Sequence, residues 1–289
     1  MDGRRGLLDL MLARMDGLRA VDKIDLLRRC RGEDDLAAYY LGDFDELRRG
    51  AEQDTMTADS LGISWLHYGE ERYPPLLREL YDPPAVLFYR GRLPDPERTM
   101  AAVVGTRKPT GMAATQAYAF GKALGEAGIP VVSGLALGID ALAHRGNIEG
   151  GGATVAVLGS GLGNVYPASN RALARRILES GGVLLSEYPP MTPPYRWNFP
   201  ARNRIIAGLG RTTVVVEAPE KSGALITAQF ALDLGRDVWI AQAGLVSPRG
   251  AGTAALANDG GRVISGIGPI LEDWGMAVDS MGGTAWQQK

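Results

Sequence analysis

Short apolar runs alternate with longer segments of helical spacing over residues 99–273. The runs are continuous and rich in Val, Ile, Leu and Ala, which is typical of strands buried on both faces of a sheet. Between them, apolar residues recur three and four apart, and two such helical segments end at Gly181 and Gly235. Strands that alternate with helices predict an α/β fold, with a parallel sheet covered by helices on both faces. The seven predicted strands occupy residues 101–105, 129–134, 154–159, 182–187, 212–218, 237–241 and 261–265.

The remaining segments have other patterns. Residues 1–60 are rich in leucine and charge, contain no proline and show helical spacing, which predicts a small N-terminal helical domain. In residues 61–98, two Pro-Pro pairs mark turns and residues 85–91 resemble a short strand, so this segment is predicted to connect the helical domain to the sheet domain. Residues 274–289 have too little apolar content for another domain and are predicted to form a flexible tail.

Composition and charge limit the cellular compartments and the kinds of partner that are compatible with the sequence. A single cysteine, Cys30, excludes an internal disulfide framework and fits a reducing compartment. No signal peptide or membrane-spanning apolar run is found, so a cytoplasmic protein without membrane contact is expected. The net charge is -2, but the residues up to Arg72 hold 11 basic against 16 acidic side chains, and the remainder holds 20 against 17. Any basic patch is therefore expected in the second part of the chain.

Loops of Gly and Ser follow the first three predicted strands of the sheet domain. In parallel sheets the carboxyl ends of the strands meet at one edge, where ligands bind. Small residues let backbone N–H groups approach a phosphate, and helix N-termini add a favourable dipole. The first loop, residues 105–111, adds Arg107 and Lys108 where a helix begins. Together these features predict a binding site for a phosphate group.

Further basic and aromatic residues follow later strands. Asn170 and Arg171 are predicted at the start of the helix after the third strand, and residues 202–204 lie at a short apolar helix. Basic groups interleaved with aromatics are expected where single-stranded nucleic acid binds, because bases stack on the rings. For Trp197 and Phe199 the alternative, that they anchor a long loop in the core, is at least as well supported. The aromatic side chains in question are Tyr166, Tyr188, Tyr195, Trp197 and Phe199.

Nothing in the sequence demands catalysis. Glu217 ends a predicted strand and is a candidate general base or ribose ligand, although a role in accepting backbone N–H groups of a loop is favoured. His67 and His144 are far apart, no metal-ligand spacing occurs, and no Ser-His-Asp arrangement is persuasive. The G-x-G-x-x-G signature with its acidic residue is missing, which argues against a dinucleotide-dependent oxidoreductase. Neither an enzyme nor a cofactor or metal is expected.

Six motifs in a fixed order resemble the DprA/Smf family, the DNA-processing proteins of natural transformation. They are GTRKPTG, VSGLALGIDALAHRG, TVAVLGSGL with VYPASNR, LLSEYPP, NFPARNRIIAGL and VVVEAPEKSGALITA, and the resemblance covers residues 62–265. It implies an extended Rossmann-type domain without a dinucleotide. It also implies binding of single-stranded DNA, loading of the RecA recombinase onto that DNA, action as a homodimer and no established catalytic activity.

The resemblance also assigns residues. Arg107 matches the DNA-binding arginine of the family, and Arg171 matches the basic position after the Y-P-x-x-N motif. Residues 133–135 and 202–204 match loops that line the same positive pocket. The predicted single-stranded DNA site comprises Gly105, Thr106, Arg107, Lys108, Ser133, Gly134, Leu135, Asn170, Arg171, Arg202, Asn203 and Arg204.

The chain departs from the family pattern at both ends. Members usually begin with a helix-hairpin-helix or sterile-alpha-motif-like module, but residues 27–44 lack a clear Gly-x-Gly hairpin, so the predicted helical domain is a degenerate one. Many members carry a C-terminal winged helix, and the residues after Trp274 are too few for one.

A second hypothesis for the same fold is a nucleotide-processing hydrolase of the lysine-decarboxylase-like group. Those enzymes carry P-G-G-x-G-T-x-x-E at the corresponding junction. Residues 217–228 read EAPEKSGALITA and lack this motif, which counts against the hypothesis.

Overall fold

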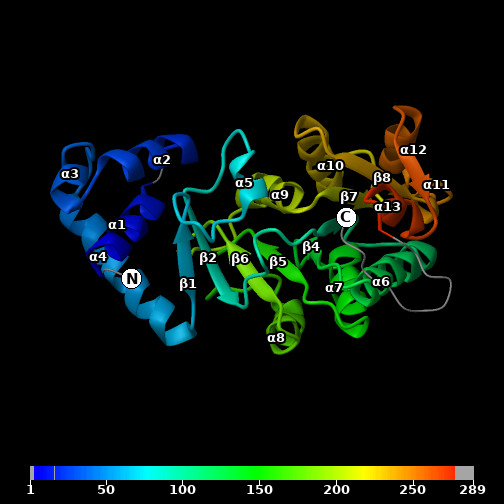
Figure 1. The fold of residues 1–289 in the computed structure, drawn as a ribbon, viewed down its shortest axis with the longest axis horizontal. Coiled ribbons are helices and arrows are strands. Elements are labelled where there is room, and N and C mark those ends of the chain that lie inside the picture. The colour runs from blue at the N-terminus through cyan, green and yellow to red at the C-terminus, as the bar shows by residue number, and fades with distance from the viewer. Residues whose placement is uncertain (1–2, 16, 277–289) are drawn as a thin grey trace.

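A computed structural model describes residues 3–15 and 17–276 of the chain. It contains one nine-stranded sheet of order β1-β2-β6-β5-β4-β3-β7-β8-β9 (Figure 1). All seven predicted strands are found, and neighbours from β6 to β9 run parallel, which confirms the predicted fold class. The strands are β1 (Ser64–His67), β2 (Val86–Gly91), β3 (Ala101–Val104), β4 (Val131–Ser133), β5 (Val155–Leu158), β6 (Val183–Ser186), β7 (Thr212–Val215), β8 (Asp237–Ala241) and β9 (Arg262–Ile264).

Two antiparallel strands extend the parallel sheet. The strand predicted over residues 85–91 is β2, which pairs antiparallel with β6. The outermost strand, β1, was not predicted and pairs antiparallel with β2, with Ser64 opposite Tyr89. The segment predicted to connect the helical region to the sheet therefore supplies two strands of that sheet.

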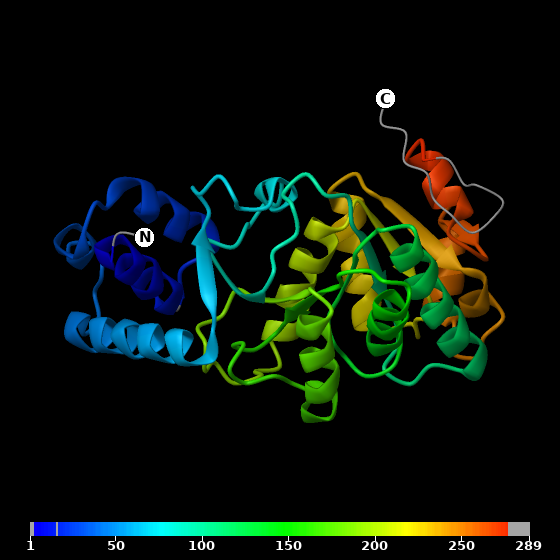
Figure 2. The same cartoon turned by 60° about the horizontal axis from the view of Figure 1, so that its bottom comes forward.

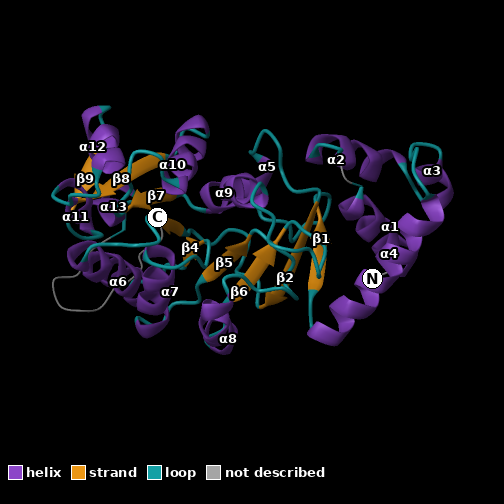
Figure 3. Ribbon diagram, turned by 180° about the vertical axis from the view of Figure 1, so that it is seen from behind, coloured by secondary structure: helices purple, strands orange, loops and turns teal. Residues whose placement is uncertain are grey.

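Helices cover both faces of the sheet, as predicted (Figures 1 and 3). Apolar side chains of α9 and α10, such as Ile206 and Ala228, pack in the core on one face. Phe120 and Leu124 of α6 pack in the core on the other face. The helices of this part are α5 (Pro75–Arg78), α6 (Gly111–Glu126), α7 (Ile139–Glu149), α8 (Arg171–Glu179), α9 (Asn198–Leu209), α10 (Gly223–Asp233), α11 (Gln242–Leu245), α12 (Ala251–Asn258) and α13 (Gly268–Asp273), with a 3₁₀ turn over Ala168–Asn170.

The predicted helix ends at Gly181 and Gly235 are confirmed, because α8 and α10 end two residues before these glycines. Glycine also lets α6 and α7 approach closely. A Cβ atom on Gly121 would lie 2.2 Å from the carbonyl oxygen of Ala143, and one on Gly146 would lie 2.1 Å from that of Tyr118. This close contact fixes α7, whose N-terminus borders the site described below.

The N-terminal region is helical, as predicted, and lies beyond the β1 edge of the sheet (Figure 2). Its buried Leu10 and Met11 belong to the same apolar cluster as Phe88 of β2, so the core continues from the helices into the sheet. On the described residues, no helix is both long and apolar enough to cross a bilayer. Trp274 packs in the core, and the predicted tail lies outside the described residues from residue 277 onward. The helices are α1 (Gly3–Arg14), α2 (Ala20–Arg29), α3 (Glu33–Ala37) and α4 (Phe44–Leu61).

Candidate functional site

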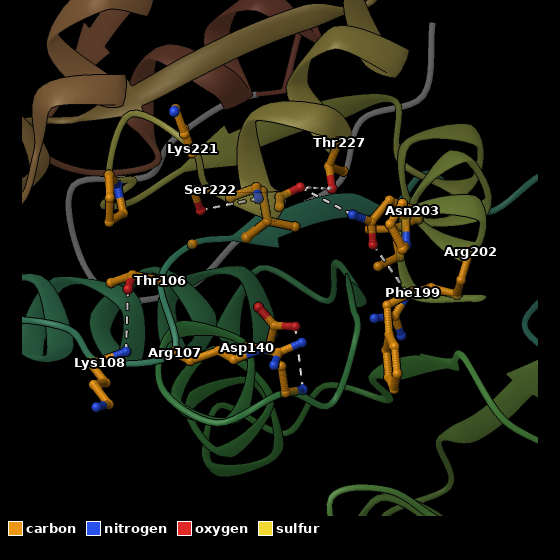
Figure 4. A pocket seen from close by; sticks show the side chains of 18 of the residues that line it. Thr106, Arg107, Lys108, Asp140, Phe199, Arg202, Asn203, Lys221, Ser222 and Thr227 are labelled. Carbon is orange, nitrogen blue, oxygen red and sulfur yellow. Dashed lines mark hydrogen bonds between the residues drawn. The ribbon is translucent and has the colours of Figure 1, made fainter. Parts of the chain in front are cut away.

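A pocket of about 950 Å³ opens at the carboxyl ends of the central parallel strands. This is the edge at which α/β sheets bind their ligands. Figure 4 shows the loop of Thr106, Arg107 and Lys108 on one side and Lys221 and Ser222 on the other. The loops after β3 and β7 thus form two walls, and α9 forms a third. The volume lies within the range of about 300–1,000 Å³ typical of small-ligand pockets.

The pocket is strongly electropositive. Its lining holds a single carboxylate, Asp140, which is buried against Arg202. The other charged side chains of the lining are cations that reach solvent, and the guanidinium of Arg249 donates to the carbonyl oxygen of Lys108 at 2.7 Å. Charge of one sign in a concave site raises the local concentration of anions. The exposed cations are Arg107, Lys108, Arg196, Lys221 and Arg249.

The loop that carries Arg107 is held by backbone contacts on both sides. The N–H of Thr106 donates to the carbonyl oxygen of Glu217 at 2.7 Å, and the carbonyl oxygen of Thr106 accepts from Ile139 at 3.2 Å. Gly138 adopts a φ of 78°, and a Cβ atom there would lie 2.4 Å from the carbonyl oxygen of Thr106. Only glycine combines this backbone conformation with so close an approach.

Asp140 and Arg202 form the floor of the pocket. Asp140 accepts from the N–H groups of Gly134 at 3.1 Å and Ala136 at 3.3 Å. Arg202 donates to the carbonyl oxygens of Gly134, at 3.0 Å, and Val157. Burial lowers the pKa of Arg202 to about 10, although the charge of Asp140 acts in the opposite direction. Burial also raises the pKa of Asp140. Asp140 and Arg202 therefore fix the loop after β4, because their hydrogen bonds are made to the backbone of the protein and not to a ligand.

The N-terminus of α10 completes the anion-binding side. Ser222 caps this helix by accepting from the N–H of Ala224 at 3.2 Å, and Asn203 donates to the carbonyl oxygen of Gly223 at 3.0 Å. Because Ser222, Gly223 and Ala224 all line the pocket, the positive end of the helix dipole faces the site.

Aromatic side chains surround one end of the pocket. The ring of Phe199 lies 5.8 Å below the guanidinium of Arg107 and 5.7 Å from the ring of Tyr166. Trp197 is 70% exposed and stacks on Tyr195, with ring centroids 4.9 Å apart and an angle of 6° between the planes. The interpretation of Trp197 as a core anchor is therefore wrong, because the loop between Pro194 and Phe199 turns this side chain outward. Pro194, Arg196 and Phe199 line the pocket, so the stacked pair stands at its rim.

The structure brings together only part of the predicted site. Gly105, Thr106, Arg107, Lys108, Arg202 and Asn203 line the pocket. Gly134 and Leu135 are buried in its floor loop, where the Ser133 hydroxyl donates to Val103 and the Asn170 amide to Leu135, so these side chains serve the scaffold. Arg171 lies at a second pocket.

Arg204, also a predicted site residue, does not line the pocket. Its guanidinium donates to Glu187 at 2.5 and 2.8 Å and to the carbonyl oxygen of Asp82 at 2.8 Å. Burial lowers the pKa of Arg204, but the charge and hydrogen bonds of Glu187 more than offset this, so the pKa is raised overall. Arg204 therefore links α9 to Glu187, the residue after β6, through a buried ion pair.

The other candidates for chemistry are internal as well. Glu217 is fully buried and accepts from the N–H of Thr110 at 2.8 Å and from the Ser247 hydroxyl, which is the loop-holding role favoured from the sequence. His144 is buried within α7, and burial lowers its pKa to about 3. Within residues 3–15 and 17–276, no three His, Cys, Asp or Glu side chains are grouped as a metal site would need.

Sequence reasoning missed three of the five exposed cations: Arg196, Lys221 and Arg249. Lys221 could have been identified from the sequence, because it directly precedes the Ser-Gly pair that opens a helix after the strand predicted over residues 212–218. Arg249 follows a short helix after β8 and reaches the site only through the tertiary fold.

Comparison with known proteins gives consistent results. A family model for DNA recombination-mediator protein A matches residues 64–275. Protein Smf of Synechocystis is 50% identical over 171 residues, which cover 58% of this chain and 43% of that protein. DNA processing protein DprA of Bacillus subtilis is 38% identical over 213 residues, or 73% of this chain and 71% of that protein. The chain thus spans less than half the length of the first relative.

Solved structures agree. DNA processing protein A of Streptococcus pneumoniae aligns over 94% of this chain and 95% of its own, with a TM-score of 0.72 and 31% identity. DNA processing protein A of Helicobacter pylori, described with its single-stranded DNA binding mode, aligns over 73% of this chain and 95% of its own, with a TM-score of 0.65 and 25% identity.

Proposed function

Since the chain belongs to the DNA recombination-mediator protein A family, we propose that its basic pocket binds single-stranded DNA. The observation that carries this proposal is the set of five exposed cations around one strand-end pocket, with exposed aromatic rings at its rim. Cations neutralise the phosphates of the backbone, and bases stack on the rings irrespective of sequence. The relative from Helicobacter pylori, which is described as binding single-stranded DNA, supports the assignment.

The aromatic rim favours single strands over duplexes. Trp197 presents a flat exposed face that is already ordered by its stack on Tyr195. Only an unpaired base can turn its own face toward such a ring, because bases in a duplex are stacked on one another. Phosphates on Arg107 and Lys221 would then place the neighbouring bases at the rim.

We further infer that the bound strand is delivered to a recombinase of the RecA type, that the chain acts as a homodimer, and that it works in the cytoplasm. The family's description as a recombination mediator supports the recombinase as partner. The test is the rate of RecA filament assembly on single-stranded DNA: the wild-type chain should accelerate it, and Arg107→Ala should not. Light scattering at several concentrations tests the dimer.

The proposal is binding without catalysis. Both carboxylate oxygens of Glu217 are occupied by Thr110 and Ser247, so this residue is not placed to take a proton from a substrate. We expect no release of base from nucleoside monophosphates. Turnover that is lost in Glu217→Gln would instead support the hydrolase hypothesis.

A salt series with a labelled oligothymidine tests the binding site itself. Five phosphate contacts predict that log K falls against log salt with a slope of about 3.5, at about 0.7 per contact for single strands. Arg107→Ala/Lys221→Ala should lower this slope by about 1.4. The control Arg145→Ala/Arg176→Ala removes two exposed arginines that do not line the pocket and should leave the slope unchanged. An equal slope in all three proteins would contradict the site.

A further inference from the structure

A second, smaller pocket of about 350 Å³ lies on the side of the sheet covered by α8. It is bounded by the end of α4, strand β2, helix α8 and the loop after β5 (Figure 1). Its charged lining consists of three arginines, Arg90 from β2 and Arg171 and Arg175 from α8. None of its lining residues is acidic.

Arg90 is half-buried, Arg171 and Arg175 are exposed, and all three differ from several arginines of the fold that are paired with a carboxylate. Arg14, Arg204 and Arg236 each have a carboxylate within 3.3 Å. In the part of the chain that the structure describes, Arg90, Arg171 and Arg175 form no ion pair. Arg171 and Arg175 are also four residues apart on one helix face, where like charges repel and destabilise the helix. An anion held between the three side chains would remove this repulsion.

The floor of the pocket is apolar. Leu162, Val165, Leu178 and Leu184 line it beside the arginines. An inorganic anion makes no favourable contact with an apolar surface. A nucleotide can place its phosphate on the guanidinium groups and the face of its base or sugar on the apolar floor. The chemistry of the lining is therefore that of a nucleoside phosphate.

The two pockets lie on either side of one loop. Val165 lines the second pocket, and the next residue, Tyr166, lines the main one. Tyr166 is 45% exposed, so its ring lies at the surface between them. A strand that leaves the main pocket over Tyr166 meets the three arginines next.

We propose that the Arg90–Arg171–Arg175 pocket is a second nucleotide site, which holds a nucleotide of the same single strand that occupies the main pocket. This inference rests on the proposed function. It assigns Arg171 to a different subsite from Arg107 and adds Arg90 and Arg175 to the path of the strand. A free nucleotide has the same chemistry, and the experiment separates the two sources.

The experiment compares wild type, Arg90→Gln/Arg175→Gln and the matched control Arg145→Gln/Arg176→Gln in a salt series. Arg176 is the neighbour of Arg175 on α8, is exposed, and does not line the pocket. Two probes are used: an oligothymidine of about 30 nucleotides and one of about 4, near the lower limit of single-strand site sizes. All substitutions are at exposed or half-exposed side chains, and thermal unfolding confirms that each variant is folded.

Loss of the phosphate contact at this pocket should lower the salt slope for the long strand by about 0.7, which amounts to about a threefold weaker affinity at about 0.2 M salt. The control variant should match wild type, and the short strand should bind all three proteins alike. An unchanged slope for the long strand in the pocket variant, with wild type binding normally, would overturn the second site and leave the proposed function standing. No binding of either strand by wild type would overturn both.

Calorimetric titration with thymidine monophosphate distinguishes a nucleotide of the bound strand from a free mononucleotide as the ligand of this pocket. The strand assignment predicts that the pocket variant changes binding of the long strand whether or not the mononucleotide binds measurably. If the variant loses affinity for the mononucleotide alone and keeps the full slope for the long strand, the assignment to the strand is overturned.

Discussion

Arg204 and Arg202 are two residues apart on α9, and the structure gives them different partners. The guanidinium of Arg204 lies on the carboxylate of Glu187, with the closest contact at 2.5 Å, and its side chain is 9% exposed. Replacing it by methionine keeps the aliphatic bulk but leaves Glu187 as an uncompensated charge beside the core. We therefore expect Arg204→Met to act on stability and not on DNA binding.

The size of the effect follows from the burial of the pair. Breaking one partner of a buried ion pair costs about 3–5 kcal/mol, and because the Glu187 side chain is 20% exposed we expect about 3 kcal/mol. This is a large part of the roughly 5–15 kcal/mol by which domains are stable. Replacing both partners by methionine removes the unpaired charge, so the double variant should lose only about 1 kcal/mol.

Urea unfolding of wild type, both single variants and the double variant gives this cycle directly. The midpoint should fall in the single variants at constant m-value and recover in the double variant. In native buffer, the salt slope for oligothymidine should be the same in Arg204→Met and wild type. A double variant as unstable as the sum of the single ones, or a lower salt slope in Arg204→Met, would refute the reasoning.

Three further predictions concern the core, the rim and the Arg107 loop. His144 has a pKa of about 3 in the folded chain against an ordinary 6.5, so on acidification the unfolded chain binds this proton before the folded chain does. The free energy of unfolding should therefore be at its full value above pH 6.5 and fall by about 1.4 kcal/mol per pH unit toward pH 3. In His144→Gln the free energy of unfolding should depend less on pH over this range. Trp197→Ala should weaken oligothymidine binding by about 1–3 kcal/mol per stacked base while Trp197→Phe keeps most of it, and equal affinities in anisotropy would exclude stacking there. Gly138→Ala should displace the Thr106 carbonyl and weaken DNA binding. Its control, Gly151→Ala, shares the positive φ in open space and should cost stability without affinity, so equal losses of affinity would contradict the prediction.

Much of the fold could be predicted because the parallel strands are continuous apolar runs. Each of the seven is long enough to be recognised without knowledge of its neighbours, and the first three lead into loops of small residues. Strand β1 lacks such a run: its Ser64–His67 stretch becomes a strand only because β2 offers it an edge to pair with. Pairing of this kind is set by tertiary contacts and not by local pattern.

The site was predictable in its central loop and less so around it. Arg107 and Lys108 follow a strand directly, so their position at the sheet edge is fixed by topology. Arg249 reaches the same pocket from 141 residues away, which no spacing rule reveals. Arg202 and Arg204 have the same residue type in the same helix, and only the fold decides that one faces the floor of the pocket and the other faces Glu187.

Photo-crosslinking of an oligonucleotide that carries bromodeoxyuridine, followed by mass spectrometry, tests most directly where the strand lies. Tyr166 and Phe199 line the pocket, Trp197 stands exposed at its rim, and the exposed Tyr39 lies in the N-terminal helical region. We predict crosslinks to the three rings at the pocket, lost in Arg107→Ala/Lys221→Ala. Crosslinks confined to the N-terminal helices, or crosslinks at the pocket that persist unchanged in that variant, would contradict the assignment of this pocket to single-stranded DNA.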